Sequence, residues 1–410
     1  MKKQLFLGLL ILFSIGVFAH TNQTSKGMNK YRSQWEQVEK FEKDNLPKSA
    51  LSVVNSIFKD AVSSKDTPQT IKSLLYINKY KISIDNETDI SIFSDIDSLI
   101  TISNKSDDKA LLHSLIAEVY LNYYDAVRWQ ISNRTDIVGY IPKDIKEWTG
   151  NIFKDKAAEH LKASVGNESE LLKQPVLNYK DILIEGEDSR TLYPTLYDFL
   201  IKRAIDQSAR MTNSYRGSQS ADFDRSLKSK GLKASDLALP ASDFLKLDFS
   251  DNDNLLILGF YQNALKSFKA RNMNESVVFT ELDRHNYLMR TVGSYTDKYA
   301  KDFLLNLERE NEAYDYNVEV IYALTQLLQR TGEPDKEDNL TRIYDWCQLG
   351  LKKYPKYSRI NLLKDVLYNI ESPYAQIKGK EVYHPDTKKK TFTLLYRNLK
   401  YVNLRIIDKN

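Results

Sequence analysis

Apolar residues recur with the period of an α-helix from about residue 29 to residue 371. Spacings of three and four residues place these side chains along one side of each predicted helix. Pro47 and the pair Thr67-Pro68 suit helix starts, because proline fits the first turn and threonine can cap it. The clearest stripes contain Ala50, Val54 and Ile57; Leu112, Leu115, Ile116 and Val119; Ile257, Phe260, Tyr261 and Ala264; and Val320, Leu324 and Leu327. The pattern predicts roughly a dozen helices, with the one that contains Leu112 at the centre.

Successive helices joined by short polar loops are expected to pack as antiparallel pairs. One pair cannot bury its apolar side alone, so repeated pairs favour a stacked array. The spacing of Ile343, Cys347, Gly350 and Pro355 resembles the second helix of a tetratricopeptide repeat, where a small residue lets helices approach and a proline ends the unit. The first helix of that motif does not align. We therefore predict a mostly α fold, an irregular tetratricopeptide-like helical-repeat array.

A polar stretch interrupts the helical pattern between residues 214 and 254. Its residues are rich in serine, aspartate, lysine and glycine, and it contains Pro240 and an acidic string from Asp248 to Asn254. Such composition is typical of loops. We therefore predict a first helical region over residues 20–213, a polar loop or hinge over 214–254, and a second, repeat-like helical region over 255–372.

After Pro373 the apolar period changes to two. Phe392, Leu394 and Tyr396 alternate with polar residues, and so do Val402, Leu404 and Ile406. Together with residues 377–383, these segments predict two or three strands over residues 373–410. So small a sheet is marginal alone. We expect it either to continue in a longer, β-rich protein, of which the chain would be a truncated segment, or to complete a partner's sheet, and we favour the first.

The first 19 residues have the pattern of a signal peptide. Lys2 and Lys3 precede an apolar run from Leu5 to Phe18, and small residues end at Ala19. The run is shorter than a bilayer span and a polar stretch follows it, so we prefer cleavage to a retained membrane anchor. A lipid anchor is not expected either, because the sequence has no cysteine near the predicted cleavage site. We expect an exported protein, in the periplasm or outside the cell, with no membrane span after cleavage.

Composition narrows the range of functions. With 42% hydrophobic and 28% charged residues, the chain resembles a globular protein. The net charge of +4 is scattered rather than clustered, which argues against a nucleic-acid partner. The single cysteine, Cys347, excludes an internal disulfide. It falls on an apolar helical stripe, so we interpret it as a packing residue rather than a nucleophile or redox centre.

Motifs that carry chemistry are absent or weak. We find no phosphate loop, no metal-binding histidine pair and no nucleophile elbow, so we predict no enzyme, no catalytic residue, no cofactor and no metal. Glu281, Asp283 and His285 lie on one predicted helix. Glu281 and His285 have the spacing of a surface pair, which we favour over metal or acid-base chemistry.

Two other groups of residues allow both a structural and a functional interpretation. Asp251 and Asp253 hint at a calcium loop, but its fifth position would be Leu255 and its glycine is missing, which favours a solvated linker. The tyrosines number 26, and clusters such as Tyr120, Tyr123 and Tyr124 could stack on carbohydrate or peptide. Tyrosine also fills seams between helices, and we favour that reading. Triplets such as Asn133-Arg-Thr135 identify no function.

Several strings, taken in order, resemble the N-terminal part of large bacterial alpha-2-macroglobulin family proteins that carry a helical extension. They are Trp35 with Leu46-Pro-Lys-Ser-Ala-Leu51; Arg128-Trp-Gln-Ile-Ser-Asn-Arg-Thr135; Leu192-Tyr-Pro-Thr-Leu-Tyr-Asp-Phe-Leu200; and Leu394-Leu-Tyr-Arg-Asn-Leu-Lys400 leading into Leu404-Arg-Ile406. The last string resembles the opening strands of the first macroglobulin-like β domain. The resemblance thus implies an incomplete β-sandwich over residues 373–410.

In that family, later domains carry a bait segment that proteases cut, and many members carry a thioester formed by a Cys-x-Glu-Gln motif. The only candidate here, Cys347-Gln-Leu-Gly350, lacks the Glu-Gln pair. The resemblance therefore implies a non-enzymatic N-terminal scaffold of an exported protease inhibitor in the cell envelope, which meets proteases through domains missing from this chain. The alternative is a stand-alone periplasmic helical-repeat module that binds an envelope protein. An enzyme or glycan-binding protein is the third hypothesis.

Overall fold

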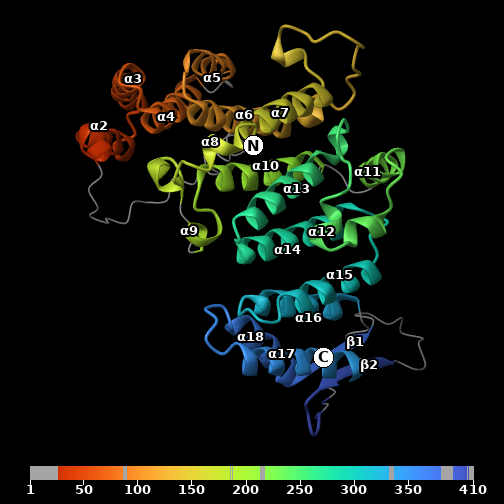
Figure 1. Ribbon diagram of the computed structural model, residues 1–410. Coiled ribbons are helices and arrows are strands. Elements are labelled where there is room, and N and C mark those ends of the chain that lie inside the picture. Colours follow the sequence, from red (N-terminus) through yellow and green to blue (C-terminus); the bar gives the residue numbers. More distant parts are fainter. Residues whose placement is uncertain are drawn as a thin grey trace, which may run out of the picture. The chain divides into compact units, whose positions relative to one another are not determined.

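The computed structural model describes residues 26–85, 90–184, 186, 188–212, 218–331, 337–379, 391–403 and 405. Their fold is mostly helical and ends in a small antiparallel sheet (Figure 1), which confirms the predicted helical array with a short C-terminal β segment. The predicted signal peptide lies outside the described residues. The chain divides into two compact units, one of residues 1–236 and 241–294 and the other of residues 237–240 and 295–410.

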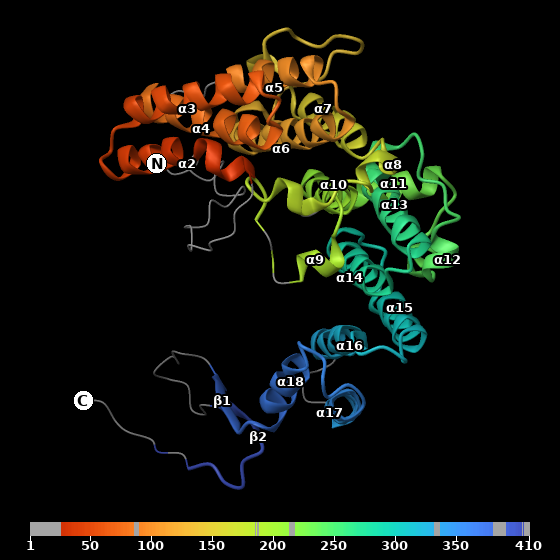
Figure 2. The ribbon, with the colours of Figure 1, turned by 60° about the vertical axis from the view of Figure 1, so that its left-hand side comes forward.

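The described residues of the first unit form helices and short 3-10 turns joined by loops. Its helices are α2 (Lys26–Lys43), α3 (Pro47–Ser63), α4 (Thr67–Asp85), α5 (Ser91–Ile102), α6 (Ser106–Ile131), α7 (Gly150–Ser164), α8 (Glu168–Leu171), α9 (Ser189–Leu192), α10 (Leu196–Thr212), α11 (Ser218–Ser229), α12 (Ala241–Phe244), α13 (Leu256–Ala270) and α14 (Asn274–Thr291). Short 3-10 turns are η1 (Ile145–Glu147), η2 (Val176–Tyr179), η3 (Ala234–Ala238) and η4 (Asp253–Leu255). Neighbours in sequence pack together, as α2, α3 and α4 do in Figure 2.

Helix starts follow the sequence closely. Helix α3 begins at Pro47, as predicted. Helix α4 begins at Thr67, but its capping side chain is Asp66, which accepts a hydrogen bond from the Gln69 amide at 3.2 Å. Thr67 is therefore the first helical residue rather than the cap. The difference is one residue and leaves the predicted helix in place.

Helix α6 is the centre of the first unit, as its stripe predicts. It packs against α5, α7, α8 and α10, and from Ala110 to Tyr123 most of its side chains are buried on every side. Because a helix covered all round loses the one-sided stripe of a surface helix, its apolar residues run almost without interruption from Leu115 to Leu121.

The polar stretch over residues 214–254 differs from the predicted loop or hinge. Residues 218–229 form helix α11, and the aromatic rings of Phe223, Phe244 and Phe249 are almost fully buried. The prediction of a loop was therefore wrong for residues 218–229. Its apolar residues are few and widely spaced, so the helical period is hidden among polar residues that face solvent. The boundary between the compact units falls after Ser294 instead.

In the second unit, the described residues form helices α15 (Asp297–Glu310), α16 (Asn317–Thr331), α17 (Glu337–Lys353) and α18 (Asn361–Glu371), followed by the strands β1 (Tyr374–Gly379) and β2 (Phe392–Arg397). Gly350 lies where α17 meets its neighbours. A Cβ atom there would lie 2.4 Å from Leu363 Cδ1 on α18 and 3.3 Å from Ile321 Cδ1 on α16. Helix α17 ends shortly before Pro355. The predicted close approach at a small residue is confirmed.

Strands β1 and β2 pair in antiparallel register from Tyr374 opposite Arg397 to Gly379 opposite Phe392. Two hydrogen bonds fix the hairpin to the end of α18, because Arg397 donates to the Asn369 carbonyl at 2.5 Å and Asn398 to the Ile370 carbonyl at 2.8 Å. Of the predicted strand around residues 402–406, the described residues 402, 403 and 405 are not in a strand, and the others lie outside the described residues.

Candidate functional site

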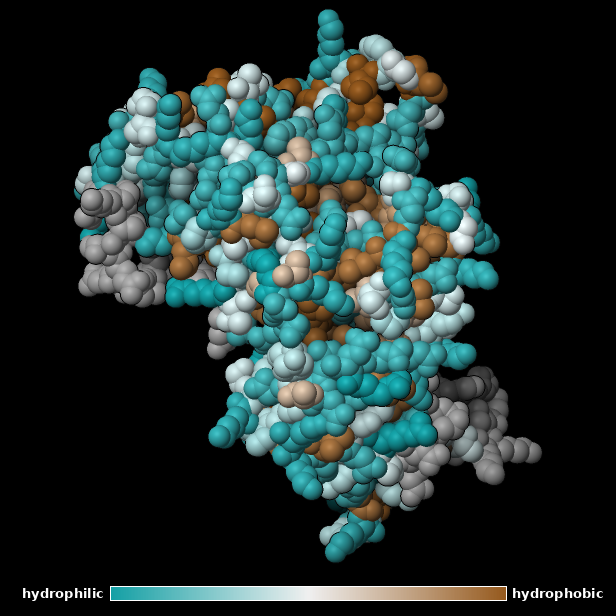
Figure 3. All heavy atoms as spheres, viewed as in Figure 1, coloured by the Kyte–Doolittle hydropathy of each residue, from teal (hydrophilic) through white to brown (hydrophobic). Residues whose placement is uncertain are grey.

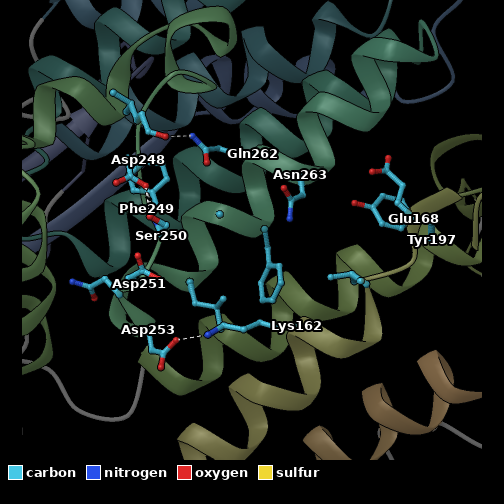
Figure 4. A pocket seen from close by; sticks show the side chains of 17 residues that line it. Lys162, Glu168, Tyr197, Asp248, Phe249, Ser250, Asp251, Asp253, Gln262 and Asn263 are labelled. Atoms are coloured by element: carbon cyan, nitrogen blue, oxygen red, sulfur yellow. Dashed lines mark hydrogen bonds and ion pairs between the residues drawn. The ribbon is translucent and has the colours of Figure 1, made fainter. Parts of the chain in front are cut away.

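The first unit contains a pocket of about 570 Å³. Such a volume suits a small ligand or a side chain of a bound peptide. Figure 4 shows its lining, which comes from the end of α7, the start of α8, α10, the loop before η4, and α13. Helix α13 leaves room here because Gly259 has open space where a side chain would begin.

The loop over residues 247–253 forms one wall and is held by its own polar groups. Asp248 accepts hydrogen bonds from the Ser250 amide at 2.9 Å and the Ser250 hydroxyl at 2.6 Å, and pairs with Lys230 at 3.1 Å. These donors, Ser250 above all, lower the pKa of Asp248 to about 2. On α13, Gln262 donates to the Phe244 and Leu247 carbonyls at 2.8 Å each. These hydrogen bonds fix the wall to α13 and to Lys230.

Carboxylates outnumber cations around this pocket. Glu168, Asp248, Asp251 and Asp253 line it, with Lys162 as their only basic neighbour among the lining residues. The Lys162 ammonium lies 2.6 Å from Asp253, a contact drawn in Figure 4. The surplus of negative charge favours a cationic or polar occupant. We call this site the acidic pocket.

Asp251 and Asp253 lie in the acidic pocket but do not form a calcium site. Asp253 is paired with Lys162, and Leu255 is fully buried. Among the described residues, no group of three or more histidine, cysteine, aspartate or glutamate side chains is arranged to hold a metal ion. Asp248, Asp251 and Asp253 are exposed, as a solvated acidic segment predicts. The neighbouring Phe249 is buried and packs on Phe244 with ring centroids 5.5 Å apart, which fixes the segment to the core.

Glu281 and His285 do not form the expected surface pair. Both are buried, with 1% and 5% of their surfaces exposed. Glu281 pairs with Arg284, whose Nη2 and Nε atoms lie 2.5 and 2.7 Å from Glu281 Oε2. The Arg284 side chain is fully buried, and its guanidinium lies 4.0 Å from the centroid of the Phe244 ring. The apolar residues of α14 are spread over several sides of the helix, so the sequence pattern did not predict that Glu281, Arg284 and His285 are buried.

Asp283 lies apart from that pair. It accepts a hydrogen bond from the Tyr261 hydroxyl at 3.3 Å and lies 3.6 Å from Lys202. The three residues of this constellation therefore do not meet at one reaction centre. Through these two contacts, Asp283 links α14 to α13 and α10.

Tyr120, Tyr123 and Tyr124 fill seams between helices, as expected. The Tyr120 ring stacks on Phe93 of α5 at 4.9 Å and on Trp148 at 5.6 Å, and Tyr123 and Tyr124 contact Phe153 of α7. Tyr120 and Tyr123 are almost fully buried. They offer no platform for a sugar or peptide.

Cys347 is fully buried, which confirms its interpretation as a packing residue. Burial raises the pKa of its thiol to about 12, so the nucleophilic thiolate is scarce at neutral pH. A thioester or redox role has no support in this environment.

Sequence reasoning missed a histidine pair between α6 and α7. The Nδ1 atoms of His113 and His160 lie 2.8 Å apart, within hydrogen-bond distance. Burial, followed by the charge on His113, lowers the pKa of His160 to about 4, and burial also lowers the pKa of His113. The two residues are 47 positions apart. No local spacing could have predicted their contact.

No protein-family model, curated protein or solved structure matches the chain. In the part of the chain that the structure describes, no helix has the length and apolar character needed to cross a bilayer.

Proposed function

We propose that this chain is a non-enzymatic scaffold, the helical N-terminal region of an exported protease inhibitor similar to the alpha-2-macroglobulin family. The ordered strings of residues that resemble that family support the proposal. The observation that carries it is the apolar face of the β1–β2 hairpin, which the family resemblance assigns to the start of a macroglobulin-like β domain.

The hairpin has one apolar and one mostly polar face. Cross-strand partners point to the same side of a sheet, so the register puts on one face Ala375, Ile377, Phe392, Leu394 and Tyr396. Ile377, Phe392 and Tyr396 are 58%, 51% and 63% exposed. A β-sandwich buries such a face against a second sheet. We name these five residues the hairpin face.

A direct test uses an antibody raised against the helical region, residues 26–372. It is applied to envelope extracts of the source cells, before and after addition of proteases with different specificities. We expect a native polypeptide far larger than the 47.5 kDa of this chain, a single early cleavage, and retention of the protease with the cleaved polypeptide. An antigen of 47.5 kDa that neither retains nor slows any protease would refute the proposal.

The acidic pocket favours a second candidate, a helical-repeat module that binds a basic segment of an envelope protein. Residues 20–372 would retain this activity, since the pocket lies entirely in the first unit. Binding of lysine-rich peptides to this segment should weaken when Glu168 and Asp251 are both replaced by lysine. Asp243→Lys is the control, because Asp243 pairs with Lys246 and does not line the pocket. Equal affinity of all three proteins would remove this candidate.

A further inference from the structure

Four exposed apolar residues of the first unit gather on one loop. Residues 132–149 connect α6 to α7, and the loop extends from the helices in Figure 1, where it is the gold segment above α7. The exposed fractions are 67% for Ile137, 101% for Val138, 55% for Tyr140 and 54% for Ile141. Figure 3 shows hydrophobic atoms at this end of the molecule. We call residues 137–142 the apolar tip.

The base of the loop is tightly held. Arg134 donates to the carbonyls of Lys146 and Trp148 at 2.6 and 2.9 Å, and the Trp148 indole donates to the Pro142 carbonyl at 2.8 Å. Asp136 accepts hydrogen bonds from Thr149 and from Asn151, at the start of α7. The base therefore fixes the direction in which the tip projects.

The tip itself has a defined turn. Ile137 and Tyr140 form a β-bridge, and the Tyr140 amide donates to the Ile137 carbonyl at 3.1 Å. Gly139 has φ of 76°, a value that glycine adopts without strain. The turn exposes aliphatic side chains that an ordinary surface loop would replace with polar ones. A convex apolar projection on a rigid base suits insertion into another apolar phase.

Charges around the tip favour a lipid surface over a protein pocket. Residues 137–142 carry no charge. Asp136 is bound to the base, and Asp144 accepts a hydrogen bond from the Lys146 amide at 2.9 Å. Lys143, directly after the tip, and Lys146 are exposed, as is the acidic Glu147 farther from the tip, and neither lysine ammonium has an ion pair among the described residues. Exposed lysines beside an exposed apolar tip are suited to anionic headgroups.

An aromatic ring near the root of the loop fits the same partner. Trp129, in the last turn of α6, is 65% exposed, and Tyr140 lies in the tip. Tryptophan and tyrosine favour the boundary between headgroups and acyl chains. We propose that the apolar tip inserts into the headgroup boundary of a bilayer that contains anionic lipid, and so holds the helical region at a membrane surface without spanning it.

The first experiment places a probe on the tip. Val138→Cys is labelled with a polarity-sensitive fluorophore, in a chain that begins at His20 because the predicted signal peptide would itself bind lipid. The native Cys347 is buried and reacts slowly. Ile102→Cys is the matched control, since Ile102 is 60% exposed on α5. With phosphatidylglycerol vesicles, emission at position 138 should shift to the blue and lipid-borne quenchers should reduce it, with neither effect at position 102.

The second experiment measures binding by sedimentation with the same vesicles. The double variant V138D/I141D should lower the vesicle partition coefficient about tenfold, because charge is expelled from the apolar region. Ile102→Asp should leave it unchanged. The pair K143E/K146E should weaken binding to anionic vesicles and leave the weaker binding to phosphatidylcholine vesicles intact. All of these positions are exposed, so thermal unfolding and circular dichroism should match those of the unaltered chain.

Three results would overturn the proposal. The first is that the unaltered chain does not sediment with either kind of vesicle. The second is that Ile102→Asp and V138D/I141D lose equal amounts of binding. The third is that the chain self-associates in solution and V138D/I141D makes it monomeric, because the tip would then dock on a second copy.

Discussion

Helix α14 and the β1–β2 hairpin place polar and apolar groups in opposite ways. On α14, the charged Arg284 is fully buried against Glu281 and Phe244. On the hairpin, Ile377 and Phe392 are more than half exposed. A buried charge persists only where neighbours pair and cover it, whereas an exposed apolar face has no cover. The helices therefore complete their own packing, and the hairpin face is suited to a further layer.

The largest effect should come from breaking the buried ion pair. Glu281→Ala leaves the Arg284 charge inside without its carboxylate and should lower the free energy of unfolding by about 4 kcal/mol. The control is Asp222→Ala, which removes an exposed pair with Arg225 and should cost less than about 0.5 kcal/mol. Urea unfolding of both variants measures the difference. Similar urea midpoints for the two variants would show that the Glu281–Arg284 pair is not buried as described.

A matched pair of truncations compares the second unit's helices with its hairpin. Leu363 on α18 is fully buried, so Leu363→Ala should lower the free energy of unfolding by about 3 kcal/mol. Ile377→Ala removes a similar volume from the exposed hairpin face and should cost about 0.5 kcal/mol or less. Urea titration followed by circular dichroism compares them. A large loss from Ile377→Ala would mean that the hairpin face is already covered.

The histidine pair predicts an acid-sensitive contact in the first unit. The folded state lowers the pKa of His160 from 6.5 to about 4, so it favours the neutral ring. The free energy of unfolding is therefore highest above pH 6.5 and falls as the pH drops toward 4, chiefly because the buried ring must be protonated; the loss is about 2 kcal/mol after a reduction for the partial exposure of the ring. Glu159 raises and Lys156 lowers this pKa to lesser extents.

His160→Gln should flatten that part of the pH profile, because glutamine does not titrate. Urea unfolding at several pH values between 7.5 and 4 measures the slope for the variant and the unaltered chain. Identical slopes would show that other groups cause the acid sensitivity.

The smallest effect should come from a single methyl group at Gly350. In a helix, alanine is favoured over glycine by up to about 1 kcal/mol, but here its Cβ would overlap Leu363 Cδ1 at 2.4 Å. Crowding should win, with a net loss of about 1 kcal/mol. Gly259→Ala is the control, since its Cβ would meet no atom within 4 Å and should stabilise α13. If both variants are stabilised, α17 and α18 are farther apart than described.

Local periodicity was enough to predict the helical array, the start of α3, the central place of α6 and the strand character of residues 392–397. It was misleading where burial depends on distant segments. The polar residues of α11 concealed a helix that Phe223 and Leu227 fix to the core, and Glu281 and Arg284 gave no sign that other helices cover them.

The candidate site was less predictable than the fold. The acidic string before η4 was visible in the sequence, but the pocket also needs Lys162 and Glu168, which lie far away along the chain. The apolar tip gave a readable signal, the uncharged run from Ile137 to Pro142 between charged residues. Its exposure depended on the hydrogen bonds of Arg134 and Asp136, which only the three-dimensional structure reveals.

The packing of neighbours such as α3 with α4, α6 with α7, and α15 with α16 has a consequence for biosynthesis. Contacts between segments close in sequence form quickly, because short loops lose little entropy on closure. Each pair can therefore assemble as soon as its second member has emerged from the ribosome. Acquisition of structure can proceed in order from the N-terminus, with the strands β1 and β2 last.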